Sequence, residues 1–106
     1  MFAWSEVLAK VERAGRNDVG ALGLRTVATI NDIAVRAGRF SGRHAFHAHA
    51  DEDELFWVID GEITVEFRDR AVRLAAGEML VVPRGVEHRT ATTDEARVVV
   101  IHPSST

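Results

Sequence analysis

The chain of 106 residues contains no cysteine and no tyrosine, and only one of its 13 basic residues is a lysine. The absence of cysteine excludes a disulfide framework, a thiolate metal site and a cysteine nucleophile. Any bound metal ion must therefore use nitrogen and oxygen ligands. Because this composition suits a reducing compartment, we expect a cytoplasmic protein.

Neither a concentrated positive charge nor a long hydrophobic run is present. The net charge is −3 and the arginines are scattered along the chain, so the sequence shows no electrostatic footprint for nucleic acid. The apolar stretch near the N-terminus contains Glu6 and Lys10, which excludes a signal peptide and a membrane span there. We expect no nucleic-acid partner and no membrane partner.

The hydrophobic pattern indicates one domain with a short helix followed by strands. Hydrophobic residues make up 46% and charged residues 27% of the chain, as in ordinary globular proteins. Residues 5–14 show helical spacing, with Ser5 as the N-cap and Gly15 after the end. We therefore assign residues 1–23 to an N-terminal helix and linker, and residues 24–106 to a barrel domain.

From residue 24 onward the apolar residues recur with a period of two, which is typical of strands. The dipeptides ND and DG mark two hairpin turns, and AAG, PRG and ATTDE separate the later strands. This density of short strands predicts an all-β antiparallel sandwich or small barrel. The predicted strands are 24–30, 33–40, 54–59, 62–67, 72–74, 79–82, 86–90 and 97–101.

Two predicted strands are apolar on both faces, more than one barrel interior can bury. In the strand 54–59, Glu54, Phe56 and Val58 share one face, which we assign to the inside. An exposed apolar patch usually marks a partner surface, so we expect a homodimer. With Met79 and Val81 facing inward, the outward apolar set is Leu55, Trp57, Ile59, Leu80 and Val82.

Three histidines and one glutamate form the candidate metal site. His47 and His49 are two residues apart, so both imidazoles project to the same face of an extended segment. Glu54 follows at the start of an apolar strand, where an isolated carboxylate would be costly to ionise and a bound cation would compensate it. His88 lies in the segment GEMLVVPRGVEHRT and could complete the set.

This ligand set suits one divalent transition metal ion per chain: Fe(II), Mn(II), Ni(II), Co(II) or Zn(II). Octahedral coordination by four side chains would leave two positions for water or for a small polar metabolite. Acid–base catalysis would then depend on Glu54 or on a water bound to the metal. Phe56 and Met79 are the expected apolar walls of the pocket.

The same residues resemble the two motifs of the cupin superfamily. The first motif appears as Gly42, His47, His49, Glu54 and Gly61, with the interval from Gly42 to His47 one residue shorter than usual. The second appears as Gly77, Pro83, Gly85 and His88, with Thr92 where the family has asparagine. The resemblance covers residues 35–101 and implies a double-stranded β-helix, a jelly-roll-like barrel. More narrowly, the chain resembles the small single-domain cupins described as mannose-6-phosphate-isomerase-like.

Two classes of function remain open from the sequence. One is a metal-dependent oxygenase, such as a dioxygenase, or an isomerase that acts on an oxygen-bearing metabolite. The alternative is a non-enzymatic module that binds or senses a small molecule and carries a structural metal ion. Other polar residues have simpler interpretations: we expect His44 and His102 at the surface, and Asp51, Glu52 and Asp53 in a solvated bend. Glu52 or Asp53 could be a metal ligand only if the strand began earlier than residue 54. Arg84 and Arg89 are surface residues by default, although either could bind an anionic substrate.

Overall fold

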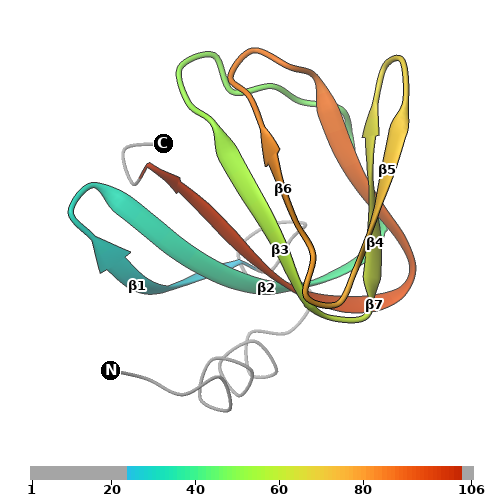
Figure 1. Ribbon diagram of the computed structural model, residues 1–106, viewed down its shortest axis with the longest axis horizontal. Helices are drawn as coiled ribbons and strands as arrows, with labels where there is room; N and C mark the ends of the chain where they lie inside the picture. Colours follow the sequence, from blue (N-terminus) through green and yellow to red (C-terminus); the bar gives the residue numbers. More distant parts are fainter. Residues whose placement is uncertain (1–23, 104–106) are drawn as a thin grey trace.

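The computed structural model describes residues 24–103 of the chain. The predicted helix over residues 5–14 and its linker lie outside this range. No helix long and apolar enough to cross a membrane occurs within it. The described residues form seven strands (Figure 1): β1 (Arg25–Ile30), β2 (Ile33–Arg43), β3 (Glu54–Asp60), β4 (Glu62–Phe67), β5 (Ala71–Ala75), β6 (Met79–Val82) and β7 (His88–Pro103).

All of the strand pairs are antiparallel, and together they make one curled sheet. The main path runs β1-β2-β7-β3-β6, while β4 pairs with β7 and with β5 (Figure 1). Both predicted hairpin turns are found, because Asn31 has a φ of 53° between β1 and β2, and Gly61 has a φ of 85° between β3 and β4. The prediction of an all-β fold is confirmed.

The long strand β7 differs from the prediction. The segment ATTDE was expected to separate two strands, but His88–Pro103 is one strand of 16 residues. Its first half pairs with β4, as in Phe67 opposite His88, and its second half lies between β2 and β3. In its polar middle, Ala91 pairs with both β2 and β4 and Thr92 pairs with β2, so the strand continues past the point where its partners change. The polar composition of this segment therefore predicted a loop, whereas the structure has a continuous strand there.

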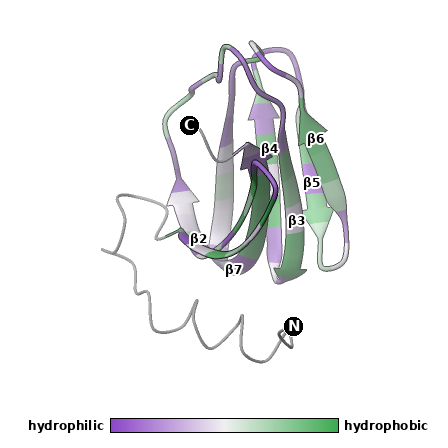
Figure 2. Ribbon diagram, turned by 90° about the vertical axis from the view of Figure 1, so that its left-hand side faces the viewer, coloured by the Kyte–Doolittle hydropathy of each residue, from purple (hydrophilic) through white to green (hydrophobic). Residues whose placement is uncertain are grey.

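The inner face of the barrel is filled by apolar side chains from six of the strands and from Leu24 before β1. Figure 2 shows β3 and β6 as mostly hydrophobic along their length, whereas hydrophobic and hydrophilic residues alternate in β4. The alternation in β4 agrees with its burial, because Ile63, Val65 and Phe67 on one face of the strand are buried. The buried inner cluster consists of Leu24, Phe40, Phe56, Val58, Ile63, Val65, Phe67, Leu74, Val82, Ala96, Val98 and Val100.

The strand β6 faces opposite to the predicted orientation. Met79 and Val81 were expected to point inward, but their side chains are 58% and 50% exposed. Val82 is buried in the inner cluster and Leu80 packs against it. Met79 lies opposite Trp57 on β3, which is itself outside the inner cluster. The short strand has only four apolar residues in a row, so alternation alone could not decide which pair points inward.

The turn glycine Gly61 offers a test of this fold. A Cβ atom at Gly61 would lie 2.8 Å from the backbone oxygen of Glu95, and its φ of +85° disfavours a side chain. We expect Gly61→Ala to lower the free energy of unfolding by roughly 2 kcal/mol or more. Gly77→Ala is the control, because Gly77 has a φ of +89° but no atom within 4 Å of an added Cβ. Urea unfolding measures both; equal losses would contradict a steric role for Gly61.

Candidate metal centre

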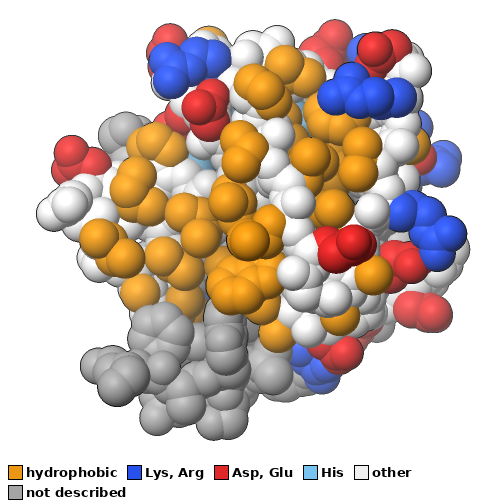
Figure 3. Space-filling view, viewed as in Figure 1, with side chains coloured by type: hydrophobic (Ala, Val, Ile, Leu, Met, Phe, Trp, Pro, Cys, Tyr) orange, Lys and Arg blue, Asp and Glu red, His pale blue; other side chains and the backbone are white. Residues whose placement is uncertain are grey.

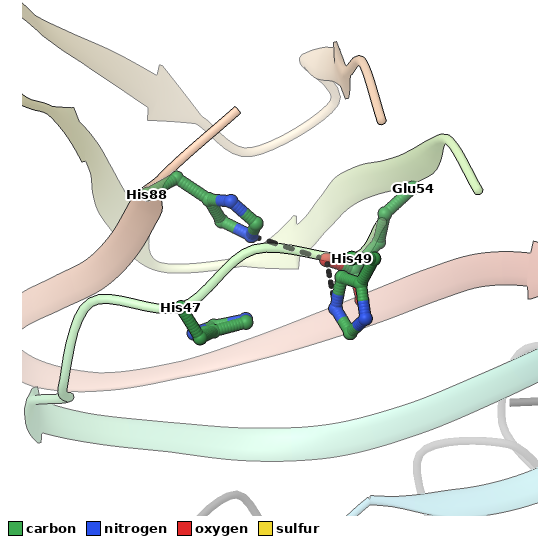
Figure 4. Close-up of side chains that lie close together, drawn as sticks. All are labelled: His47, His49, Glu54 and His88. Atoms are coloured by element: carbon green, nitrogen blue, oxygen red, sulfur yellow. Dashed lines mark hydrogen bonds and ion pairs between the residues drawn. The ribbon is translucent and has the colours of Figure 1, made fainter. Parts of the chain in front are cut away.

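The four predicted ligands come together at one end of the barrel. His47 and His49 lie in the segment after β2, Glu54 is the first residue of β3, and His88 is the first residue of β7. Figure 4 shows their side chains pointing toward one another from these three places. One ligand atom from each residue lies within 4.8 Å of the others. Residues 34 positions apart in the chain, such as Glu54 and His88, thus meet in one cluster.

Backbone hydrogen bonds hold the histidine segment against β7. His47 and His88 form an isolated antiparallel bridge in which each backbone N–H donates to the other backbone oxygen at 2.9 Å. The N–H of Gly85 donates to the oxygen of His49 at 2.7 Å. The second motif is therefore bonded directly to the first, so the positions of three ligands are fixed relative to one another.

Two of the imidazoles have their protonated nitrogen fixed by backbone carbonyls. His47 Nδ1 lies 3.2 Å from the oxygen of Ala45, and His88 Nδ1 lies 2.9 Å from the oxygen of Val86. A carbonyl oxygen only accepts hydrogen bonds, so the proton must lie on Nδ1 in both histidines. In the neutral ring Nε2 then carries a lone pair, which is the form that ligates a metal ion.

The carboxylate of Glu54 lies between two of these imidazoles. Its Oε1 is 3.2 Å from His88 Nε2 and 3.5 Å from His49 Nε2. The second contact lacks hydrogen-bond geometry, so His49 Nε2 is buried without a hydrogen-bond partner. Two lone-pair atoms face each other where Glu54 meets neutral His88, and a proton or a metal ion between them removes the repulsion. The donor set of three imidazoles and one carboxylate therefore fits a divalent transition metal ion.

The electrostatics of the pair Glu54–His88 reflect this arrangement. Burial alone would raise the pKa of Glu54, but the hydrogen bond with His88 and the charges of His49, His88 and His47 together lower it. Burial alone would lower the pKa of His88, but the hydrogen bonds with Glu54 and with the oxygen of Val86, and the charge of Glu54, together raise it. Each partner thus favours the charged form of the other.

Glu52 is a buried carboxylate that the sequence analysis placed in a solvated bend. Its neighbours Asp51 and Asp53 are exposed, as expected, but Glu52 is only 7% exposed. Its Oε1 lies 3.9 Å from His49 Nδ1, on the side of the ring away from Glu54. No periodic signal marks this position, because the path of the segment between β2 and β3 decides which of the acidic residues turns inward.

Of the two predicted pocket walls, one lies beside the cluster. The ring of Phe56 is buried and its centroid is 5.9 Å from that of His88. Met79 is on the outer face of β6, so its assignment to the pocket is wrong. Leu80 and Val82 occupy the inner face of that strand instead.

The other polar residues also differ in part from expectation. His44 packs edge-on against the ring of Phe40, and its Nε2 is buried without a hydrogen-bond partner. His102 is buried at the end of β7, so neither histidine is an ordinary surface residue. Both flanking arginines are paired with carboxylates: Arg84 with Asp53 at 3.5 Å and Arg89 with Glu66 at 2.6 Å.

The coupling between Glu54 and His88 predicts a pH dependence in the metal-free protein. We expect His88 to titrate above its ordinary value of 6.5, and Glu54→Gln to lower this pKa. The contribution of His88 to stability is lost as the pH rises through its raised pKa. The contribution of Glu54 is lost as the pH falls through its lowered pKa. Histidine NMR titration measures the effect, and an unchanged His88 midpoint in Glu54→Gln would contradict the coupling.

Comparison with known proteins places this chain in a family. The chain matches the Cupin domain family over residues 34–102, more than half of its length. The uncharacterized protein YdbB of Bacillus subtilis (strain 168) is 39% identical over 66 residues, which are 61% of this chain and 58% of YdbB. This chain therefore spans less than two thirds of the length of YdbB.

Solved structures agree with this match. A cupin-2 domain containing protein from Shewanella frigidimarina NCIMB 400 is 39% identical, with a TM-score of 0.75 over 76% of this chain and 78% of that one. Protein NMB1881 from Neisseria meningitidis is 24% identical, with a TM-score of 0.70 over 76% of this chain and 83% of that one, a likeness of fold alone. The family match and the shared fold lead to one conclusion: this chain belongs to the cupin family.

Proposed function

We propose that the chain binds one divalent transition metal ion through His47, His49, Glu54 and His88, and binds a small polar metabolite beside it. The observation that carries the proposal is the contact between Glu54 Oε1 and His88 Nε2 at 3.2 Å. The Nδ1 of His88 is already committed to the oxygen of Val86, so Nε2 of the neutral ring can serve only as an acceptor. A cation between the two acceptors satisfies both.

The metal ion would supply Lewis-acid chemistry toward an oxygen-bearing metabolite, or redox chemistry if it is iron or manganese. The protein's own residues would orient the metal ligands and the bound metabolite. The carbonyl oxygens of Ala45 and Val86 fix two imidazoles, and the buried ring of Phe56 forms an apolar wall beside His88. Glu54 is the proposed acid–base group, since its carboxylate accepts a hydrogen bond from His88 Nε2 when that imidazole is protonated.

A dioxygenase with a redox-active metal ion and an isomerase with a redox-silent one are the two forms of this proposal. The resemblance to the mannose-6-phosphate-isomerase-like group describes a fold relationship, so it selects neither. The identity of the metal ion after purification would separate the two forms. Failure to detect turnover with a bound metabolite would favour the alternative of a binding or sensing module. The cytoplasmic location stays a prediction.

Metal uptake is the direct test of the site. We expect about one Fe(II), Mn(II), Ni(II) or Zn(II) ion per chain after anaerobic reconstitution, measured by elemental analysis. His88→Ala should weaken binding by more than about 100-fold, because it removes a ligand and not merely an outer partner. Asp51→Asn is the control, since it removes an exposed carboxylate from the same segment. Uptake of none of the four metals would disprove the proposal.

We also propose that the outer face of the sheet binds a second copy of the chain. The strand register aligns two rows of side chains across this face, each with one residue from β6, β3, β7, β2 and β1. Of the ten residues in these two rows, only Arg25 is charged. Figure 3 shows hydrophobic side chains gathered over β3 and β6 and continuing toward β1 and β2. Five strands at about 4.8 Å make rows roughly 20 Å wide, which suits a two-fold interface. The rows are Val81, Leu55, Ile101, Val35 and Ala28, then Met79, Trp57, Val99, Ala37 and Arg25.

Charge substitution on this face tests the dimer. We expect Val81→Glu and Trp57→Glu to shift the protein toward monomer, because an isologous interface would bury each new carboxylate twice. Val81 is 50% exposed in the isolated chain, so Val81→Glu should leave the fold intact. Thr93→Glu is the control at an exposed site of β7. Light scattering at micromolar concentration measures the mass, and a monomeric unmodified protein would contradict the proposal.

A further inference from the structure

Glu52 is a buried carboxylate outside the set of four candidate ligands. Its side chain is 7% exposed, whereas Asp51 and Asp53 on either side of it are exposed. It is not one of the four residues whose ligand atoms lie within 4.8 Å of one another. Burying a charged carboxylate is unfavourable unless a cation or a hydrogen-bond donor compensates it. The position of Glu52 therefore calls for a partner.

The group beside Glu52 is the imidazole of His49. The Oε1 atom of Glu52 lies 3.9 Å from Nδ1 of His49, which is within ion-pair distance but too long for a hydrogen bond. Of the basic groups in residues 24–103, only this imidazole lies within ion-pair distance of Glu52. A movement of roughly 1 Å would bring the two atoms to the separation of about 2.8 Å that is usual for a charge-assisted hydrogen bond.

His49 differs from the other two imidazoles in the group that faces its Nδ1 atom. In His47 and in His88 this atom faces a backbone oxygen, so Nε2 is the ligating atom of both rings. In His49 it faces a side chain, because the neighbouring atom is Oε1 of Glu52. A histidine that ligates a metal ion almost always donates its other N–H group to a carboxylate, a backbone oxygen or water. The three imidazoles thus follow one scheme, with two carbonyls and one carboxylate as outer partners.

Two carboxylates compete for the single proton of a neutral His49. Figure 4 shows the ring facing Glu54, whose Oε1 lies 3.5 Å from Nε2. A proton on Nε2 would point toward Glu54 and would block this atom as a ligand. A proton on Nδ1 points toward Glu52 and leaves the lone pair of Nε2 directed at the cluster. The Nε2 atom is buried without a hydrogen-bond partner, as the second form requires of an atom that receives a metal ion.

The charge balance of the cluster gives Glu52 a second effect. A divalent ion bound by three neutral imidazoles and the carboxylate of Glu54 retains one positive charge. The side chains of His88 and Glu54 are only 1% and 12% exposed, so solvent compensates such a charge poorly. An ionised Glu52 on the far side of His49 supplies the missing negative charge. It also makes the imidazole a stronger donor to the metal ion, because a carboxylate at Nδ1 raises the basicity of Nε2.

We propose that Glu52 is a positioning residue of the metal centre, which accepts a hydrogen bond from Nδ1 of His49 and so holds the Nε2 lone pair of that imidazole toward the metal ion. Glu52 acts through His49 and does not touch the ion itself. Its carboxylate serves metal binding, whereas in the metal-free barrel the buried charge contributes no stability. This inference rests on the proposed metal site and adds the residue that orients its third imidazole.

Substitution of Glu52 in the full chain tests this role. We expect Glu52→Leu to weaken Zn(II) binding roughly 10- to 100-fold, as does the loss of other outer partners of metal-ligating histidines. Glu52→Gln should lose less affinity, because its amide oxygen can still accept the hydrogen bond from His49. Asp51→Asn removes an exposed carboxylate from the same segment and should leave the affinity unchanged. Competition with a chelator measures the affinity of each variant.

Two further measurements distinguish positioning from a structural role. In a His49→Ala background, Glu52→Leu should have little further effect on Zn(II) affinity, because the residue through which Glu52 acts is gone. Urea unfolding of the metal-free protein should show that Glu52→Leu does not lower the free energy of unfolding. The substitution replaces an incompletely paired buried carboxylate with an apolar side chain of similar size, a change that is often neutral or stabilising.

The outcomes that would overturn the inference are distinct from those that would overturn the metal site. Unchanged Zn(II) affinity in Glu52→Leu, the same loss in the His49→Ala background, or a matching loss of metal-free stability would overturn the role of Glu52 alone. Failure of the unmodified protein to bind Zn(II) would also overturn it. Failure to bind any of Fe(II), Mn(II), Ni(II) and Zn(II) would overturn the proposed function as well.

Discussion

The pairing of β7 is the constraint on which the rest of the structure depends. This strand of 16 residues bonds to β4 with its first half and lies between β2 and β3 with its second half. It therefore joins the main path of the sheet to the β4–β5 hairpin and closes the barrel around the inner cluster. Its first residue is His88, so the element that closes the fold also carries a candidate ligand. Disruption of β7 would affect both the core and the metal centre.

Much of the fold and of the site followed from local patterns in the sequence. The dipeptides ND and DG marked two turns correctly because Asn31 and Gly61 adopt positive φ angles that few residues tolerate. The spacing of His47 and His49, with an inward Glu54, indicated three members of the cluster. These features depend on neighbouring residues alone, so a single sequence is enough to find them.

The remaining features depend on contacts between distant segments. The polar segment ATTDE begins with Ala91 and Thr92, which pair with β2 and β4, so β7 continues into it. The orientation of β6 follows from its pairing with β3, which puts Met79 beside Trp57 on the outer face. Glu52 is buried by the path of the segment between β2 and β3, which no pattern of neighbouring residues indicates. Side-chain chemistry could not reveal any of these placements before the register was known.

The bridge between His47 and His88 has a consequence for the thermodynamics of metal binding. Its two backbone hydrogen bonds, each 2.9 Å long, join the backbones of two candidate ligands directly. The conformational entropy of bringing these ligands together is therefore lost during folding and not during coordination. A metal ion at this cluster would then meet ligands that the fold already holds together, unlike the ligands of small domains that fold only around their metal ion. One bound metal ion would then exchange for another within an intact fold, and the cellular metal supply would determine which ion occupies the cluster.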